Sequence, residues 1–402
     1  MDSPRARRPL EGLRVIEAGQ LLAGPFAATI LGYYGAEVIK VEPPDGGDPI
    51  RRWRVVKDGT SLWWYSLARN KKCVTLDLRQ PEGRALMRRL VEKSDVFIEN
   101  FRPGTMEKWG LGPEDFKATN PGLIYSRISG YGQTGPYAPR PGFASVCEGF
   151  GGFRYVNGFP GQPSVRPNLS IGDTLAGVHA ALGILLAYIG RDRVTQGAGQ
   201  VVDVAIFESI YNLMEAVVPE YDGAGVVREA SGSTLTGIVP SNIYPTKDGK
   251  TIIIGANTTP MFERLCEMMG EPEMARDPRY KENNDRVTHQ EELDGRIARW
   301  TSTMSQVDVL AKLEEAGVAA GPIYSVEDMF ADPQYHARGL FEQVETPSGP
   351  LKIPAIIPRL ADTPGHTDWA GAMLGTHNDE VYTGVLGLDA AELAALKARR
   401  IV

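Results

Sequence analysis

Apolar and polar positions follow two different periods over the first 130 residues. Short runs rich in Val and Ile predict strands at residues 13–18, 36–42, 74–78, 96–99 and 124–128. Between them, residues 26–34 and 81–93 have helical spacing and are bounded by Gly or Pro. Strands that alternate with helices favour a mostly parallel, doubly wound sheet. We therefore predict an α/β protein.

The pattern changes after residue 130. Residues 130–172 are crowded with Gly, Pro and aromatic side chains and show no helical period, and loops of this length inside a compact domain are usually functional. The apolar run at 174–190 falls short of the roughly 20 residues of a membrane span, so it predicts a buried core helix. A strand at 200–204 and a helix at 205–218 are expected to follow.

A second, smaller domain is predicted further along the chain. Residues 223–237 are flexible by composition and mark a boundary. A strand at 252–254, a helix at 260–269 and further helical segments up to residue 316 suggest a small α/β domain. From residue 322 the chain is Pro-rich, and we expect it to be irregular until a short helix near Ala390.

Composition and charge exclude several classes of protein. The 402 residues carry 43 Lys+Arg against 50 Asp+Glu, a formal net charge of −7, which argues against nucleic acid or an anionic membrane as a partner bound through the overall field. Residues 1–8 are basic, but no apolar segment precedes the first strand. We therefore expect a cytoplasmic protein without a secretory signal.

The Cys and His residues do not have the spacing of metal ligands. Three cysteines and five histidines are scattered without a C-x-x-C or an H-E-x-x-H pattern. We predict no metal site, and buried thiols in a reducing compartment.

The first strand-helix-strand unit allows a nucleotide-binding interpretation. Glu42 ends the second strand about 20 residues after the first turn, as in dinucleotide-binding folds. The turn at residues 21–27 nevertheless lacks the G-x-G-x-x-G that brings backbone close to a pyrophosphate. A purely structural unit is favoured over NAD binding.

Asp173 directly precedes the apolar run of the predicted long helix. There the helix dipole and the free N–H groups favour the ionised carboxylate that a nucleophile requires. The alternative is an ordinary N-cap aspartate, worth about 1 kcal/mol, and the local sequence alone favours it.

Basic loop residues and one Gly-containing loop are further candidates. The loop at residues 232–240 could present N–H groups to an oxyanion, or could serve as a hinge between domains. An Arg fork suits a carboxylate and a Lys suits a phosphate, although each single residue is more often a solvated charge. The basic residues in question are Arg69, Lys71, Lys72, Arg102, Lys108, Arg140, Arg154 and Arg166.

Seven segments in a fixed order carry a family resemblance. They are PLEGLRV (9–15), LAGPFA (22–27), GAEVIKVE (35–42), NKK (70–72), ENFRPG (99–104), SGYGQTGP (129–136) and the Gly172-Asp173 pair. With them the chain resembles the class III CoA-transferases, the family of formyl-CoA transferase and carnitine CoA-transferase, over nearly its whole length.

The resemblance implies a covalent mechanism with Asp173 as the nucleophile. Asp173 would attack an acyl-CoA to give an anhydride, take up CoA as an aspartyl thioester and pass it to an acceptor acid. The loop with Gly237 and Ile238 would close over Asp173 and donate N–H groups. CoA is then a substrate, no permanently bound cofactor is expected, and water has to be excluded.

The resemblance also implies an architecture and a CoA site. We expect a large Rossmann-like CoA-binding domain at residues 1–222 and 331–402, a small domain at 223–330, and a homodimer of two interlocked rings. The residues implied to contact CoA are Leu22, Asn70, Lys71, Lys72, Asn100, Arg102 and Lys108.

Departures from the family pattern bear on the substrate. Ala144 stands where many relatives carry an acid, and Phe143 stands where racemases of the family carry a histidine, so the two-base pair for racemisation is missing. Arg140, Phe143 and Arg166 are the implied acceptor contacts, and the context of Arg166 resembles the succinyl-CoA:dicarboxylate branch.

We therefore predict CoA transfer from an acyl-CoA, with succinyl-CoA as the suggested donor, to a small carboxylic or dicarboxylic acid. Two alternatives stay open at this point. One is an acyl-CoA racemase or isomerase on the same fold. The other is a non-catalytic protein that binds CoA esters, which the missing acid at Ala144 would favour.

Overall fold

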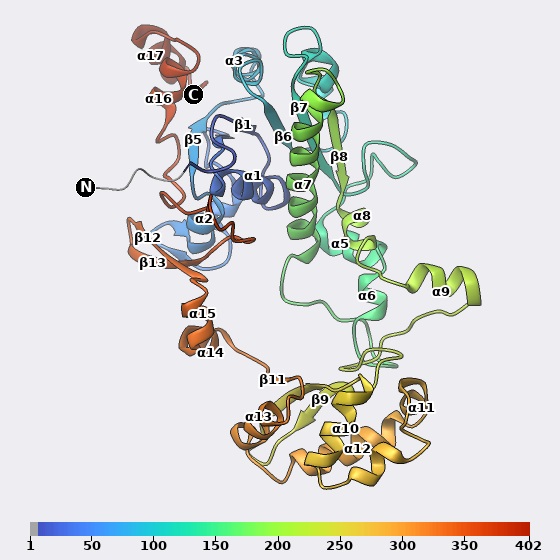
Figure 1. Ribbon diagram of the computed structural model, residues 1–402. Coiled ribbons are helices and arrows are strands. Elements are labelled where there is room, and N and C mark those ends of the chain that lie inside the picture. Colours follow the sequence, from blue (N-terminus) through green and yellow to red (C-terminus); the bar gives the residue numbers. More distant parts are fainter. Residues whose placement is uncertain (1–6) are drawn as a thin grey trace. The chain divides into compact units, whose positions relative to one another are not determined.

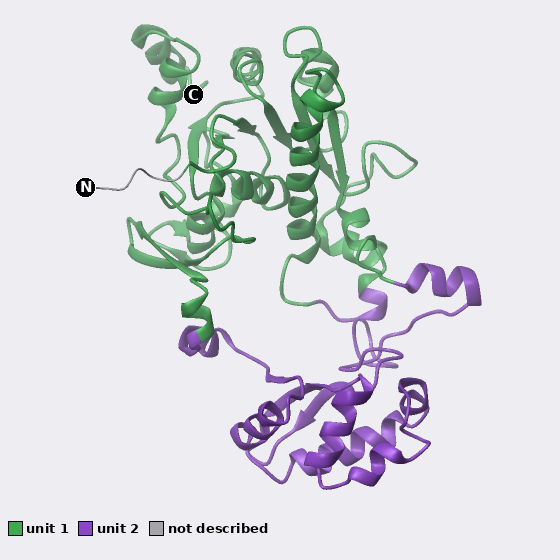
Figure 2. Cartoon of the chain, viewed as in Figure 1, with its two compact units in different colours: residues 1–153, 167–215, 334–402 green, residues 154–166, 216–333 purple. Residues whose placement is uncertain are grey.

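The computed structural model describes residues 7–402; residues 1–6, which hold most of the basic opening, lie outside the described residues. The chain divides into two units (Figure 2). Unit 1 comprises Met1–Phe153, described from residue 7, with Pro167–Glu215 and Gln334–Val402, and unit 2 comprises Arg154–Arg166 and Ala216–Pro333. The sequence placed the borders after residues 222 and 330, and it did not separate residues 154–166 from the large domain.

Unit 1 contains a six-stranded sheet in the order β5-β2-β1-β6-β7-β8, in which all neighbours are parallel (Figure 1). The strand order reverses between β1 and β6, as in doubly wound folds. The strands are β1 (Arg14–Glu17), β2 (Glu37–Glu42), β5 (Lys71–Thr75), β6 (Val96–Glu99), β7 (Ile124–Ser129) and β8 (Val201–Ala205). The predicted α/β fold with a mostly parallel sheet is confirmed.

Helices cover both faces of this sheet, because adjacent residues of each strand point to opposite sides. On β1, Ile16 belongs to the core under α3, α16 and α17, whereas Val15 belongs to the core under α1 and α7. These helices are α1 (Ala23–Tyr33), α3 (Pro81–Val91), α7 (Ile171–Arg193), α16 (Asn378–Gly384) and α17 (Ala390–Ala398).

Helix α7 is buried on one face only. Its side towards the sheet contributes Ala176, Ala180 and Ile184 to the core. Its other side exposes an apolar row formed by Val178, Leu182, Leu186 and Ile189. The predicted buried core helix is therefore confirmed for one face of α7 and is wrong for the other. Within residues 7–402, α7 is the one helix that is long and apolar enough to cross a membrane, by length and composition alone.

Several local predictions differ from the structure. The third strand, predicted at 74–78, lies at 71–75, because the apolar pattern of Leu76 and Leu78 continues into a buried loop. The helix predicted at 205–218 is two helices, α8 (Ile206–Tyr211) and α9 (Val217–Ala224), with Glu215 at φ 46° between them. The loop at 130–172 contains α5 (Ala144–Phe150) and α6 (Phe153–Val156).

The C-terminal part is also more regular than the sequence predicted. Strands β12 (Phe341–Thr346) and β13 (Gly349–Pro354) form an antiparallel hairpin in which Thr346 faces Gly349. Pro347 lies in the turn, and Pro350 and Pro354 lie in the second strand of an isolated two-stranded pair, where no inner ladder needs their missing N–H. The remaining short elements of this unit and its border are α2 (Leu62–Leu67), α4 (Thr105–Lys108), α15 (Pro333–Ala337), β3 (Val56–Lys57) and β4 (Thr60–Ser61).

Unit 2 is a small α/β unit around an antiparallel sheet of order β11-β10-β9. Its buried Arg286 donates to the carbonyls of Val239, Tyr280 and Asn257, which ties the helices to the sheet. The elements are β9 (Ser241–Pro245), β10 (Thr251–Gly255), β11 (Ala320–Pro322), α10 (Thr259–Met268), α11 (Asn283–Thr288), α12 (Gln290–Thr301), α13 (Gln306–Glu315) and α14 (Val326–Ala331).

Candidate active site

A cavity of about 370 Å³ lies in unit 1 at the carboxyl ends of β1, β6 and β7. In open α/β sheets, ligands bind outside the carboxyl ends of the strands where the strand order reverses, and here that point lies between β1 and β6. The lining residues are Gln20, Leu21, Leu22, Ala23, Asn100, Phe101, Arg102, Pro103, Ile128, Ser129, Gly130, Arg140, Gly142, Phe143, Asp173 and Ile206.

Asp173 lies on the wall of this cavity, in the first turn of α7. The helix begins at Ile171 with Ser170 as its N-cap, so Asp173 is the third helical residue and not the N-cap that the local sequence favoured. The side chain is half-buried. At this position the dipole of a long helix stabilises a negative charge.

Residues of α5 surround the start of α7 closely. A Cβ atom on Gly172 would lie 3.3 Å from the Cβ of Ala144 and 3.0 Å from Ile206, so α7 approaches its neighbours where it has no side chain. The fully buried Glu148 accepts a hydrogen bond of 3.4 Å from the Gly172 N–H. The sequence analysis missed Glu148; the signal was an acid at helical spacing from Ala144 inside a Gly-rich apolar stretch.

Cys147 is unsuited to act as the nucleophile in this cavity. Burial, together with the charges of Asp173 and Glu148, raises the pKa of its thiol to about 11. The thiol is therefore neutral near pH 7, and thiolates are the reactive form. All three cysteines are buried and free, which confirms the predicted buried thiols.

The structure brings six of the predicted site residues together around this cavity. They are Leu22, Asn100, Arg102, Arg140, Phe143 and Asp173. The guanidinium of Arg140 stacks 3.6 Å above the ring of Tyr137, and the ring of Phe143 is 65 % exposed. The cavity wall thus carries two basic groups, one apolar ring and one carboxylate. Such a wall can bind a carboxylic acid and a thioester at the same time.

Four predicted CoA contacts lie elsewhere. Lys71 and Lys72 open β5, at the amino ends of the strands, whereas ligand loops follow the carboxyl ends. Lys71 is 1 % exposed, and burial lowers its pKa. Asn70 is buried against residues 366–369, and Lys108 is exposed at the end of α4. Lys71 and Lys72 therefore lie in a strand and not in the predicted loop, whereas the CoA contacts of Asn70, Lys71, Lys72 and Lys108 stay predictions.

The remaining predicted residues belong to unit 2. The Ile238 N–H donates to the Leu235 carbonyl, and the Gly237 carbonyl accepts from Asn283. Gly237 has φ 79°, a left-handed conformation that favours glycine. Arg166 ends the segment Arg154–Arg166 and is exposed. The roles of Gly237, Ile238 and Arg166 beside Asp173 stay predictions.

A second cavity of about 250 Å³ follows the carboxyl ends of β1, β2 and β5. Gln20 and Phe101 line both cavities, so the two hollows adjoin along one edge of the sheet. Glu42, the acid that allowed a dinucleotide-binding interpretation, is bound by Arg51 through two hydrogen bonds of 2.7 Å. Its carboxylate thus has an internal partner. Within residues 7–402 no group of three or more His, Cys, Asp or Glu residues could hold a metal ion.

Comparisons with known proteins agree with this geometry. The family model described as CoA-transferase family III matches residues 10–378. The succinyl-CoA–D-citramalate CoA-transferase of Chloroflexus aurantiacus is 50 % identical, over 100 % of both chains. The succinyl-CoA–L-malate CoA-transferase alpha subunit of the same species is 43 % identical, over 98 % of this chain and 92 % of that one. The crystal structure of a CAIB/BAIF family protein from Brucella suis superposes with a TM-score of 0.81 and 34 % identity, over 94 % and 100 % of the two chains. The chain therefore belongs to CoA-transferase family III and is an enzyme of that class.

Proposed function

We propose that this enzyme transfers CoA from succinyl-CoA to a small 2-hydroxydicarboxylic acid, with Asp173 as the covalent carrier. The observation that carries the proposal is the place of Asp173 in the first turn of α7, on the wall of the cavity at the reversal of the sheet. The names of the two relatives support the donor. Citramalate and malate, the acceptors in those names, are both dicarboxylic acids with a hydroxyl on C2.

The reaction proceeds through acyl transfers that conserve all atoms. A carboxylate oxygen of Asp173 attacks the thioester carbonyl. The C–S bond breaks, the CoA thiolate departs, and an anhydride between Asp173 and the succinyl group is formed. The thiolate then attacks the Asp173 carbonyl, which releases succinate and leaves an aspartyl-CoA thioester. The acceptor carboxylate then attacks the aspartyl-CoA thioester, which releases CoA thiolate and gives an anhydride between Asp173 and the acceptor. The thiolate attacks the acceptor carbonyl of this anhydride, so that the new acyl-CoA forms and the Asp173 carboxylate is restored. Water is neither consumed nor formed, and the site has to exclude it.

CoA is proposed to lie along the shared edge of the two cavities. Its thioester end would reach Asp173 past Leu22 and Asn100, and its remaining length would follow the carboxyl ends of β1 and β2. Phe101 lines both hollows and packs edge-to-face on Trp109, which gives the ligand an apolar surface at the crossing point.

Two groups are proposed to select the acceptor. Arg140 offers a planar fork for the second carboxylate. Ser129, which the sequence analysis quoted only as part of a motif, ends β7 on the cavity wall; its hydroxyl oxygen is buried without a hydrogen-bond partner within residues 7–402. A buried unpaired hydroxyl costs about 1–3 kcal/mol, and the hydroxyl of a 2-hydroxy acid would satisfy it.

A homodimer is proposed from the apolar face of α7. The row formed by Val178, Leu182, Leu186 and Ile189 is between 42 % and 61 % exposed, and apolar rows of this kind mark interfaces. Light scattering should give a particle with twice the chain mass of 43.8 kDa. Leu186→Asp should lower the particle mass toward that of a single chain. A wild-type particle of one chain mass would contradict the dimer. A cytoplasmic location stays a prediction.

The test of the carrier is chemical trapping. The enzyme is incubated with succinyl-CoA without acceptor and quenched with hydroxylamine, which converts an activated aspartyl group into a hydroxamate that peptide mass spectrometry detects. We expect the label on Asp173 and a loss of turnover of about a thousand-fold or more in Asp173→Ala. Asp192→Asn, an exposed acid in the last turn of the same helix, is the matched control. Full turnover in Asp173→Ala would overturn the proposal.

A panel of acceptors tests the substrate class. Citramalate, malate, succinate and glutarate are assayed with succinyl-CoA, and Ser129→Ala is assayed beside the wild type. The hydroxy acids should have the highest kcat/KM, and the variant should reduce that preference by about tenfold or more. Equal kcat/KM values for malate and succinate in the wild type would contradict the role of the hydroxyl.

A further inference from the structure

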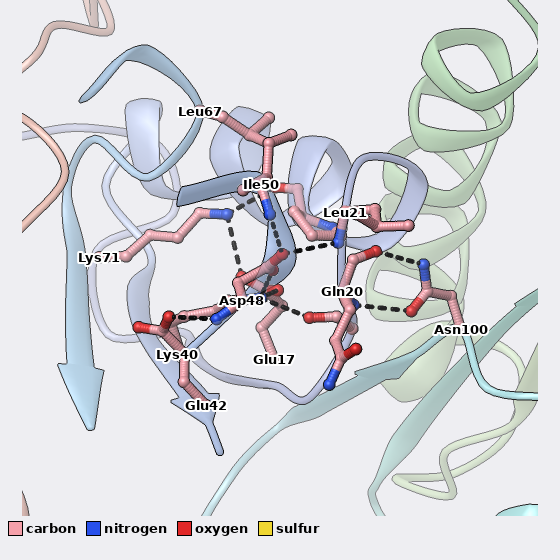
Figure 3. Close-up of polar contacts among 12 residues, drawn as sticks. Glu17, Gln20, Leu21, Lys40, Glu42, Asp48, Ile50, Leu67, Lys71 and Asn100 are labelled. Atoms are coloured by element: carbon pink, nitrogen blue, oxygen red, sulfur yellow. Dashed lines mark hydrogen bonds and ion pairs between the residues drawn. The ribbon is translucent and has the colours of Figure 1, made fainter. Parts of the chain in front are cut away.

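Residues 19–25, the turn after β1 together with the first turn of α1, are held at both ends by buried ammonium groups (Figure 3). Lys40 donates to the Gly19 carbonyl at one end, and Lys71 donates over 2.6 Å to the Pro25 carbonyl at the other. Both lysines bind the same carboxylate: Glu17 Oε1 lies 2.7 Å from Lys40 and Oε2 lies 2.9 Å from Lys71. Glu17 thus bridges the two clamps.

The middle of this segment is held by two further side chains. Asp48 accepts the Leu21 N–H over 3.0 Å through Oδ1, and its Oδ2 lies 2.8 Å from Lys40. Asn100 accepts the Gln20 N–H and donates to the Gln20 carbonyl, both over 2.8 Å. Four side chains therefore fix the backbone of residues 19–25.

The same segment forms part of the active-site wall, and Asn100 lines that wall beside it. Gln20, Leu21, Leu22 and Ala23 line the cavity that holds Asp173. Leu21 has φ 64°, a left-handed conformation that costs a non-glycine residue about 1 kcal/mol or more and persists only where its surroundings impose it. The hydrogen bond from the Leu21 N–H to Asp48 is a direct constraint on that residue.

Stability alone is a weak explanation for this cluster. The side chains of Glu17, Lys40, Asp48 and Lys71 are each at most 1 % exposed, and two carboxylates balance two ammonium groups. Buried ion pairs of this kind are often no more stable than apolar side chains of the same volume. What an apolar cluster cannot do is hold the carbonyls of Gly19 and Pro25 and the N–H of Leu21 in place.

We propose that Asp48 is a positioning residue, which holds Leu21 in its left-handed conformation and so sets the wall at residues 20–23 against Asp173. This inference rests on the proposed function, because it takes the cavity at Asp173 as the place of reaction. Asp48 lines neither cavity and acts through the backbone of the segment. The shared carboxylate of Glu17 and the two lysines transmit the same constraint to both ends.

The test compares three variants in one trapping assay with succinyl-CoA. Asp48→Ala removes all three side-chain contacts, to the Leu21 N–H, the Ile50 N–H and Lys40. Asp48→Asn keeps an oxygen for the two N–H groups but turns an amide towards Lys40. Tyr382→Phe removes one buried hydrogen bond, to the Thr75 carbonyl, from the same unit without contact to residues 19–25. Each protein is measured at a temperature at which its near-UV spectrum shows it folded.

We expect the rate of Asp173 labelling in a single turnover to fall about a hundred-fold in Asp48→Ala and about threefold to tenfold in Asp48→Asn. Tyr382→Phe should lower Tm and leave the labelling rate unchanged. A purely structural role of Asp48 would give the pattern of Tyr382→Phe. Partial rescue by the conservative variant separates positioning from loss of fold.

The outcomes distinguish this inference from the proposed function. If the wild type is not labelled at Asp173, the proposed function fails. If the wild type is labelled and folded Asp48→Ala is labelled at the same rate, the positioning role of Asp48 is overturned while the carrier stands. Should Asp48→Ala not fold, Asp48→Asn decides: a fall of threefold or more supports the role, and an unchanged rate overturns it.

Discussion

Two walls of the same cavity are built in opposite ways. Residues 19–25 are fixed through their backbone by buried charged side chains. Arg140 and Phe143, on another part of the cavity wall, present exposed side chains beside an aromatic group of Tyr131, Tyr137 and Phe150. The first wall suits a ligand part that never changes, such as the thioester, and the second suits an acceptor that differs between substrates.

The largest effect is expected where the fixed wall meets α7. A Cβ atom on Gly177, one turn after Asp173, would lie 2.8 Å from the Ala23 carbonyl, and that backbone atom has no room to move. Gly177→Ala should therefore force α1 away from α7, with a loss of about 3 kcal/mol in the free energy of unfolding and a large loss of turnover. Urea denaturation measures the first quantity and a CoA-transfer assay the second.

Gly190→Ala is the matched control for this prediction. Gly190 lies on the same helix, and nothing within 4 Å would meet its Cβ. The substitution should stabilise the protein by up to about 1 kcal/mol, because alanine favours the helix. If Gly177→Ala behaves like Gly190→Ala, the wall at residues 19–25 is not held as tightly as we infer.

The adaptable wall is probed by Arg140. Removal of a guanidinium that binds a substrate carboxylate should cost about 2 kcal/mol, so Arg140→Ala should raise the KM of the acceptor about thirtyfold and leave the stability nearly unchanged. Arg140→Lys should restore only part of this, because an ammonium group lacks the planar fork. Steady-state kinetics with malate and succinyl-CoA separate the two KM values. A rise in the KM of succinyl-CoA alone would place Arg140 on the donor instead.

We expect the stability of the protein to depend on pH through Glu99, which holds the turn after β6 by accepting the Phe101 N–H. Its carboxylate accepts from Arg127 and from the Phe101 N–H, both over 2.8 Å, and burial raises its pKa to about 7. The folded state binds a proton at Glu99 more tightly than the unfolded state does. The contribution of this proton to the stability of the fold is complete below about pH 4.5 and is lost as the pH rises through 7.

The free energy of unfolding should therefore fall by about 2–3 kcal/mol between pH 5 and pH 8 through this group. Glu99→Gln should have a flatter profile in urea titrations over that range, since the amide does not titrate. Parallel profiles for the wild type and Glu99→Gln would show that the Arg127 ion pair cancels the effect of burial.

The two walls also differ in how far the sequence could predict them. The period of the strands was sufficient for the parallel sheet. The local sequence around Asp173 favoured an ordinary N-cap, and only the family resemblance singled this residue out as the nucleophile. The lysines at 71 and 72 were misplaced, since a basic residue at the start of a strand has the same sequence signature as one in a loop. Buried Lys71 is bound by Glu17, which lies more than 50 positions away in the chain. Half-buried Lys72 pairs with Glu37 and Glu380.

The unpredicted features share one physical origin. Glu148 and Ser129 became candidates only because packing placed them beside Asp173, and no periodicity reports which buried polar group lacks a partner. Helix α7 was predicted as a core helix from the length of its apolar run, and that run does not say which face the same chain leaves exposed. Long-range contacts, not local propensity, decide these points.

The smallest effect is expected for Phe143, at the mouth of the adaptable wall. Its ring is 65 % exposed, so Phe143→Ala removes little buried surface and should change the free energy of unfolding by less than about 0.5 kcal/mol. The lost apolar contact should shift the ratio of kcat/KM for glutarate over malate by less than about tenfold, since one apolar side chain discriminates by about 1 kcal/mol. The ratio is measured with both acids in one competition assay. A loss of a hundredfold for both acids alike would place Phe143 among the fixed residues and remove the distinction between the two walls.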